Sequence, residues 1–171
     1  MKHFLGIFSM LVMLFAFSTT VFAIEHVTCD VQCPEFALID TDENIITNTS
    51  LRGKPTIMVF LFVYCIFGKN TIKGIGRSDW YQDGKVNVIF GMLDGTKEAT
   101  KAYQDTYGYE GMRFCYAEEN GDVFGTFKEM FNLTGGVAES GGYAIPQIFL
   151  MDSNGKIFLR WQGVFEEDQI S

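Results

Sequence analysis

The residues of this chain whose side chains most readily do chemistry are its four cysteines, Cys29, Cys33, Cys65 and Cys115. A thiolate attacks disulfides and electrophiles, and it also binds soft metals. Cys65 differs from the others because it follows an unbroken apolar run, residues 56–63, and precedes a segment that is predicted to start a helix. The partial positive charge at a helix N-terminus favours a thiolate. The sequence therefore predicts Cys65 as a nucleophile, with an inert cysteine at a strand end as the alternative.

Basic side chains follow Cys65 at helical spacing. Lys69, Lys73 and Arg77 are four residues apart, so a helix places them in one stripe, with Lys69 one turn from Cys65. This cluster is informative because the chain as a whole is acidic, with 13 Lys and Arg residues, 21 Asp and Glu residues and a formal net charge of -8. Three glycines weaken the same helix by about 1 kcal/mol each relative to alanine, namely Gly68, Gly74 and Gly76. Packing must therefore hold this helix in place.

The first 23 residues are expected to be a secretory signal peptide. A basic start precedes a run without charge, residues 4–17, and small side chains lie just before Ile24. This run is shorter than the roughly 20 residues that a spanning helix needs, so we expect cleavage rather than a retained anchor. The mature chain is then periplasmic or secreted, without stable membrane insertion. Its acidic charge argues against nucleic acid as a partner.

The mature chain has the length of one domain. We expect residues 24–34 to be a short cysteine-containing leader and residues 35–171 to be the domain. Elements of two kinds alternate along it, which predicts an α/β fold: a central mixed sheet with helices on both faces and an N-terminal β-hairpin. Strands are expected at residues 36–39, 45–47, 56–63, 86–90, 111–116, 147–151 and 156–161.

The helices and turns of this prediction rest on local signals. Asp94 or Thr96 can cap a helix that runs to about Tyr107. A second helix follows Asp122 and has apolar residues at helical spacing, namely Val123, Phe127, Met130 and Phe131. Residues 132–142 form a glycine-rich connection, and Asn154-Gly155 between two apolar runs predicts a hairpin.

Three stretches resemble the TlpA/ResA-like thioredoxin-fold proteins of the redoxin (AhpC/TSA) superfamily. Residues 36–55 end in the turn LRGKP, residues 59–65 form an apolar strand that leads into Cys65, and residues 144–156 read AIPQIFLMDSNGK. The resemblance covers about residues 35–165. It implies a thioredoxin-like fold and thiol-disulfide exchange with a thiol- or disulfide-bearing protein or a small thiol. It implies no cofactor.

The resemblance also assigns roles to residues. Cys65 matches the nucleophilic cysteine, and Pro146 matches the proline whose cis peptide faces it, so both are candidate catalytic residues. A cis bond would expose the backbone of Ile145 for strand-like pairing with a bound peptide; the alternative is a proline that only starts a strand. Tyr64 replaces the family's tryptophan, and Lys69 supports the site through its charge.

The chain departs from the family at Gly68, which stands where the second cysteine of the Cys-x-x-Cys motif belongs. Without that thiol, a mixed disulfide at Cys65 cannot be released by internal attack. Thr71 stands where some members carry a glutamate. A peroxiredoxin is disfavoured because Phe62 occupies the place of the threonine or serine that binds peroxide.

The other three cysteines leave alternatives open. Cys115 is expected on a strand that neighbours the one before Cys65. Cys29 and Cys33 can bridge each other, and this pair, or Cys29 with Cys115, can either fasten the leader to the domain or exchange with Cys65. A soft-metal site from His26, Cys29 and Cys33 lacks an evident fourth ligand, so no metal is expected. Three functions remain: mixed-disulfide chemistry through Cys65 alone, a redox-inactive binding module, and a redox protein with a non-standard resolving cysteine.

Overall fold

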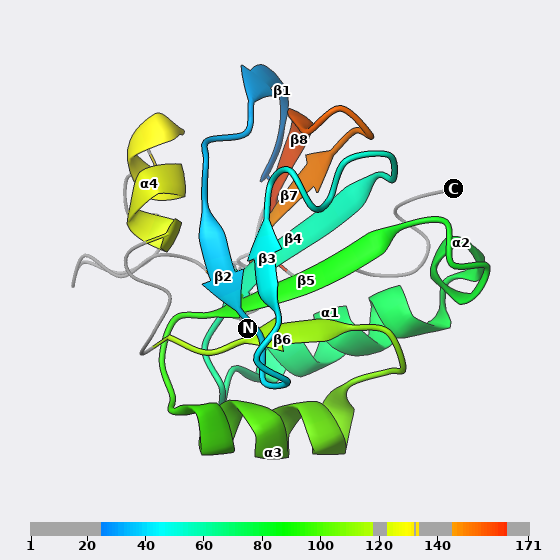
Figure 1. The fold of residues 1–171 in the computed structure, drawn as a ribbon, viewed down its shortest axis with the longest axis vertical. Helices are drawn as coiled ribbons and strands as arrows, with labels where there is room; N and C mark the ends of the chain where they lie inside the picture. Colours follow the sequence, from blue (N-terminus) through cyan, green and yellow to red (C-terminus); the bar gives the residue numbers. More distant parts are fainter. Residues whose placement is uncertain (1–24, 118–122, 132, 134–144, 164–171) are drawn as a thin grey trace, which may run out of the picture.

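Strand β4, Thr56–Leu61, lies in the middle of a six-stranded sheet in the computed structural model, which describes residues 25–117, 123–131, 133 and 145–163 (Figure 1). Its six residues are all buried, as the continuous apolar run predicted. The strand order is β1-β8-β7-β4-β5-β6. The other five strands are β1 Glu25–Gln32, β5 Asn87–Met92, β6 Arg113–Cys115, β7 Gln147–Met151 and β8 Lys156–Gln162.

The sheet is mixed, as predicted. β4, β5 and β6 run parallel, whereas β7 pairs antiparallel with β4 and β8 pairs antiparallel with β7. The turn between β7 and β8 contains Asn154-Gly155, and Gly155 has a φ of 83°, a conformation that glycine adopts without strain. The predicted terminal hairpin is therefore confirmed.

The structure differs from the expectation at the leader. Residues that were expected to precede the domain form β1, which pairs antiparallel with β8 at the edge of the sheet, and Cys29 lies where the register shifts between Thr28 and Val31. In the segment EHVTCDVQ, Val27, Cys29 and Val31 alternate with polar residues, a period-2 pattern typical of a strand that the expectation of a leader overlooked. Strand formation here depends on the free hydrogen-bonding edge of β8, which only the folded chain supplies.

Helices cover both faces of the sheet. Helices α1 (Ile66–Arg77), α2 (Asp79–Gln82) and α3 (Lys97–Tyr107) pack on one face. Helix α4 (Val123–Met130) and the hairpin of β2 (Ala37–Ile39) and β3 (Ile45–Thr47) pack on the other. Within β4, Val59 and Leu61 face the first layer, whereas Met58 and Phe60 face the second. Of the predicted core positions of α4, Phe127 is buried but Met130 is exposed.

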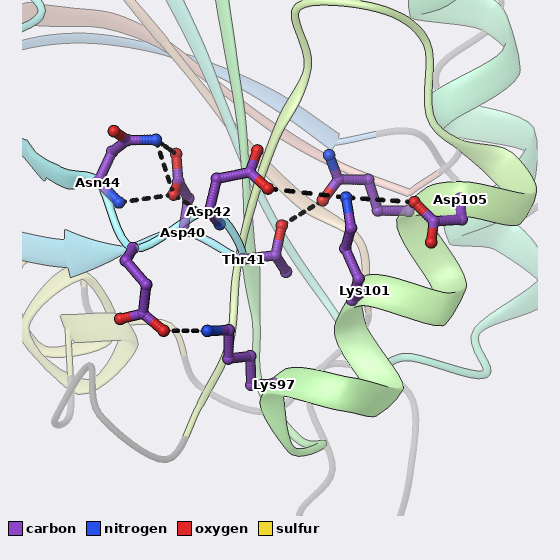
Figure 2. A network of polar contacts seen from close by, with 9 residues as sticks. Asp40, Thr41, Asp42, Asn44, Lys97, Lys101 and Asp105 are labelled. Atoms are coloured by element: carbon purple, nitrogen blue, oxygen red, sulfur yellow. Dashed lines mark hydrogen bonds and ion pairs between the residues drawn. The ribbon is translucent and has the colours of Figure 1, made fainter.

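The turn between β2 and β3 fastens the hairpin to β6 and α3 (Figure 2). The buried carboxylate of Asp40 accepts the backbone N–H groups of Asp42 and Asn44 at 3.0 and 2.8 Å. The Thr41 N–H donates to the Phe114 carbonyl at 2.9 Å, and the Thr41 hydroxyl hydrogen-bonds to the side chain of Gln104. Ion pairs at the surface join the same turn to α3, namely Lys97 with Glu43 and Lys101 with Asp42. The hairpin thus holds α3 at the edge of the sheet.

Thr96, one of the two predicted caps, is the N-cap of α3, and its side chain accepts the Ala99 N–H at 3.3 Å. The C-cap of the helix is Gly108. Asp94, the alternative cap, instead binds the loop after β4. The expected signal peptide and most of the glycine-rich connection, residues 132 and 134–142, lie outside the described residues. Across the described ranges, no helix combines the length and apolar character that a bilayer crossing needs.

Thr96→Ala removes the side-chain cap of α3, and we expect it to lower the free energy of unfolding by about 1 kcal/mol. Thermal unfolding monitored by circular dichroism should show a Tm lower by about 3 °C. Thr106→Ala on the exposed side of the same helix is the matched control and should change stability by less than about 0.5 kcal/mol. Equal effects of the two substitutions would contradict a capping role.

Candidate functional site

Cys65 lies at the junction between β4 and α1, as the sequence predicted. It is the N-cap residue of α1, with an extended backbone, and its N–H donates to the Phe62 carbonyl at 3.0 Å. Its carbonyl accepts the N–H of Lys69 at 3.3 Å, which starts the helix. The side chain makes no capping bond and is half-buried. The sulfur is therefore free to react and lies at the positive end of the helix.

The loop before Cys65 is fixed by the connection after β5. The Val63 N–H donates to Oδ1 of Asp94 at 2.7 Å, and the Leu93 N–H donates to the Leu61 carbonyl at 2.9 Å. A hydrogen bond to a carboxylate is stronger than one between neutral groups. Asp94 thus positions the loop that carries Cys65, a role that the sequence did not reveal.

The structure brings Pro146 to Cys65, although the two are far apart in the chain. The Ile145–Pro146 peptide bond is cis. The Cys65 Sγ lies 4.0 Å from the Ile145 carbonyl oxygen. Pro146 is buried and Ile145 is half-buried. The sulfur and the backbone just before β7 therefore border the same site, in the arrangement that the resemblance implied.

Gly68 faces Cys65 from the first turn of α1. It is buried, and a Cβ added there would lie 3.6 Å from the Cys65 Cβ and 2.9 Å from Cδ1 of Leu61. The same Cβ would lie 3.4 Å from the Oη of Tyr103. Glycine is thus the residue that lets a tyrosine hydroxyl from α3 approach the site.

Tyr103 is a site residue that sequence reasoning missed. Its side chain is 5 % exposed, and its hydroxyl has no hydrogen-bond partner in the part of the chain that the structure describes. The ring packs against Tyr107 and Phe114, with centroid distances of 4.9 and 6.3 Å. Burial chiefly raises the pKa of Tyr103, and negative charge on Cys65 raises it further. The available signal was a pair of polar side chains on the buried side of α3, Thr100 and Tyr103.

The supporting residues lie around Cys65 in different ways. The Lys69 Nζ lies 4.5 Å from the centroid of the Tyr107 ring, a cation–π contact that joins α1 to α3. Tyr64 is 83 % exposed and has open access to solvent beside the sulfur. Three further exposed apolar side chains flank Cys65 in the sequence, namely Phe62, Ile66 and Phe67. The surface next to the sulfur is therefore apolar, and the basic stripe continues away from it along α1.

The other three cysteines lie elsewhere in the fold, and all four thiols are free. Cys33 and Cys115 are buried in the apolar layer opposite α1, and Cys29 packs against it. Cys115 was expected on a strand next to the one before Cys65, but it belongs to β6, and β5 lies between β6 and β4. Two strand spacings amount to about 9.6 Å. Disulfide formation needs Cα atoms within about 7 Å.

Cys33 and Cys29 lie toward the opposite end of β4 from Cys65. The Cys33 N–H donates to the Gly155 carbonyl at 3.0 Å, in the turn that follows β7. The last residue of β7 pairs with Thr56, the first residue of β4, whereas Cys65 follows the last one. The length of β4 places the two ends about 17 Å apart. The described fold thus brings no second cysteine to Cys65.

A metal site at Cys29 and Cys33 gains no support from the geometry. Within the described side chains, no group of three or more His, Cys, Asp or Glu residues is arranged to hold a metal ion. The side chain of His26, the third ligand considered, lies outside those described.

The comparisons with known proteins identify the fold. No protein-family model matches the chain, and no curated protein matches it in sequence. Among solved structures, the thioredoxin domain of a thiol-disulfide oxidoreductase from Bacteroides vulgatus is similar, with a TM-score of 0.60 at 18% identity over 83% of this chain and 91% of that one. A thiol:disulfide interchange protein from Bacteroides sp. gives 0.60 at 18% identity over 78% and 81%.

A member of the Sco family of cytochrome c oxidase assembly proteins, BsSco, has a TM-score of 0.65 at 15% identity, over 86% of this chain and 92% of that one. These likenesses confirm the predicted thioredoxin-like fold. The neighbours are thiol:disulfide interchange proteins and relatives of that fold. Identities this low establish the fold and leave the function to be argued from the site.

The burial of the cysteines predicts an order of alkylation. In the native protein at pH 8, iodoacetamide should label Cys65 first, whereas Cys33 and Cys115 should be labelled only after unfolding in guanidinium chloride. Peptide mapping by mass spectrometry reads out the order. Native labelling of Cys33 or Cys115 as fast as that of Cys65 would contradict this assignment.

The same burial predicts a pH dependence of stability. Burial raises the pKa of Cys33 from 9.0 to about 12, so the folded thiol keeps its proton at pH values where the unfolded thiol has lost it. This contribution to stability is complete below about pH 9 and is lost as the pH rises toward 12. Chemical unfolding at a series of pH values should show this decrease, and Cys33→Ala should make it smaller. An unchanged pH dependence in the variant would refute the assignment.

Proposed function

We propose that this protein exchanges thiols and disulfides through a single nucleophilic cysteine, Cys65. The observation that carries the proposal is the position of Sγ, at the N-terminus of α1 and 4.0 Å from the Ile145 carbonyl beside Pro146. A helix N-terminus favours the thiolate, which is the attacking species. The solved structures of similar fold that are named as thiol:disulfide interchange proteins add support by analogy.

The chemical step is an exchange of disulfide partners. The thiolate of Cys65 attacks one sulfur of a disulfide R–S–S–R′, the new Cys65–S–S–R bond forms, and R′–S⁻ leaves. Because residue 68 is glycine, release needs a second thiol from outside the chain. Its thiolate R″–S⁻ attacks the R sulfur, R–S–S–R″ forms, and the Cys65 thiolate leaves. No net oxidant is consumed, since one disulfide is present before and after the cycle.

The surroundings of Cys65 support a protein or small thiol as the partner. Exposed apolar side chains, such as Phe62 and Ile66, flank the sulfur, and they suit an apolar segment next to a partner cysteine or disulfide. The backbone of Ile145 lies next to the sulfur and can pair with such a segment. The acidic charge of the chain disfavours nucleic acid. Residues 1–23, as a signal peptide, place the mature protein in the periplasm or outside the cell.

A redox-inactive binding module is the second candidate, and Gly68 is the observation that favours it. Loss of the resolving position is compatible with a site that only holds a partner at the apolar surface beside Pro146. If the protein is such a module, Cys65→Ala should leave partner binding intact. If it exchanges disulfides through Cys65, the same variant should no longer form a mixed disulfide with its partner.

Incubation with oxidised glutathione tests the proposal directly. The native protein should gain one glutathionyl group, which peptide mapping should locate at Cys65, and Cys65→Ser should gain none. Cys29→Ser is the matched control because Cys29 is the other half-buried cysteine, and it should gain the group as the wild type does. A folded wild-type protein that takes no adduct, or takes it at Cys29, would rule the proposal out.

Gly68→Cys should restore a dithiol site. The Cβ position at residue 68 lies 3.6 Å from the Cys65 Cβ. Natural disulfides have a Cβ separation of about 3.5–4.5 Å. Leu61 must move slightly, and its Cδ1 is the free end of a flexible side chain. We expect the variant to form an internal disulfide with Cys65 and to reduce insulin catalytically with dithiothreitol.

Gly68→Ala is the matched control for this variant, because it adds the same Cβ without a thiol. It should fold and should not reduce insulin catalytically. If Gly68→Cys is folded but its introduced thiol stays free under oxidation, the site does not have thioredoxin-like geometry.

A further inference from the structure

We propose that the Tyr103 hydroxyl donates a hydrogen bond to the Cys65 thiolate across Gly68, where the second thiol of a Cys-x-x-Cys motif would otherwise lie. The inference rests on the proposed function, since it concerns the reactive form of Cys65. It makes Tyr103 a positioning and charge-stabilising residue of the exchange reaction.

The Tyr103 hydroxyl is a buried donor, and the described residues offer it no acceptor. Tyr103 as a whole is 5 % exposed. Buried hydroxyl groups in proteins nearly always have a partner, so an unpartnered one needs a reason. The ring packs against Tyr107 and Phe114, two aromatic side chains that help to hold it in this buried position.

This hydroxyl lies close to Gly68, next to Cys65. The Cβ position at Gly68 is 3.4 Å from the Tyr103 Oη and 3.6 Å from the Cys65 Cβ, so the two groups are no more than 7.0 Å apart. The thiol now points to the Ile145 carbonyl, at 4.0 Å. Cysteine has three staggered χ1 positions, and the proposed contact uses one that turns Sγ from the Ile145 carbonyl toward Gly68. An ionised sulfur gains nothing from a carbonyl oxygen and gains from a hydroxyl donor.

The electrostatics of the site fit a donor rather than an acceptor. Burial and, after it, the charge of Cys65 raise the pKa of Tyr103, so the phenol stays protonated and can donate. Two charged groups nearby make contacts of their own. Lys69, from α1, lies over the ring of Tyr107 on α3, and Asp94, after β5, accepts the Val63 N–H. Tyr103 is therefore the donor best placed to reach the sulfur.

This contact would act at both halves of the exchange. A stabilised thiolate is more abundant at neutral pH when Cys65 attacks. It is also a better leaving group when an external thiol releases the mixed disulfide. The second effect matters here because Gly68 supplies no internal thiol.

Tyr103→Phe tests the inference, since it removes the hydroxyl and keeps the ring. A hydrogen bond to a charged group raises the population of the ionised form by roughly a factor of ten. We therefore expect alkylation of Cys65 by iodoacetamide to be about tenfold slower at pH 7. At pH 10, where thiols ionise without the help of a donor, the rates should be equal or the variant should be faster. A steric effect would slow the reaction at both pH values.

The stability of the variants separates this role from a structural one. Because the Tyr103 hydroxyl has no partner in the described fold, Tyr103→Phe should leave Tm unchanged or raise it. Tyr81→Phe is the control, because the Tyr81 hydroxyl donates to the Glu110 carbonyl away from the site. It should lower Tm and leave alkylation of Cys65 unchanged. Gly68→Ala adds a methyl beside the hydroxyl and should also slow alkylation at pH 7.

The outcomes are distinguishable from failure of the proposed function. If Tyr103→Phe and Gly68→Ala both alkylate like the wild type at pH 7, the hydrogen bond is overturned, whatever glutathione does. If the wild type takes no glutathionyl group, the proposed function fails, and the alkylation rates still report whether Tyr103 acts on Cys65.

Discussion

The close approach of α1 to β4 and α3 is the constraint on which the rest of the site depends. Gly68 and Gly76 lie on the buried side of α1, where a Cβ at Gly68 would lie 2.9 Å from Leu61 Cδ1 and one at Gly76 would overlap the ring of Tyr109. Glycines weaken an isolated helix. Here they let Ile72 and Ile75 pack fully into the core, which offsets that cost. The helix that begins at Cys65 is therefore held by packing, as its sequence required.

The cysteine thiols of this fold differ in their exposure to solvent. One thiol lies at the end of the central strand, half-exposed and next to the Ile145 carbonyl, while two others are sealed in the apolar layer on the far face. The separation follows from the sheet itself, because Cys115 is two strands away and Cys33 lies near the other end of β4. This arrangement supports the proposed exchange through a single sulfur.

The fold alone would not have led to that conclusion. Thioredoxin-like neighbours at 15–18% identity show how the chain is arranged, and one fold can host different activities. Local features of this chain support the proposed function: glycine at residue 68, a tyrosine hydroxyl that approaches it, and an apolar surface around the sulfur. Asp94 contributes indirectly, since it fixes the loop that presents Cys65.

The sequence by itself determined the elements whose signals are local. The apolar run of β4, the Thr96 cap of α3 and the Asn154-Gly155 turn were all readable, because each depends on residues close in the chain. The motif resemblance also paired Cys65 with Pro146. Tertiary structure decided that the leader pairs as β1, since this short alternating segment needs the hydrogen-bonding edge of β8 as its partner. It also decided that Tyr103 meets Gly68. That contact joins α1 and α3, and the spacing of residues in the sequence does not show how closely two helices pack.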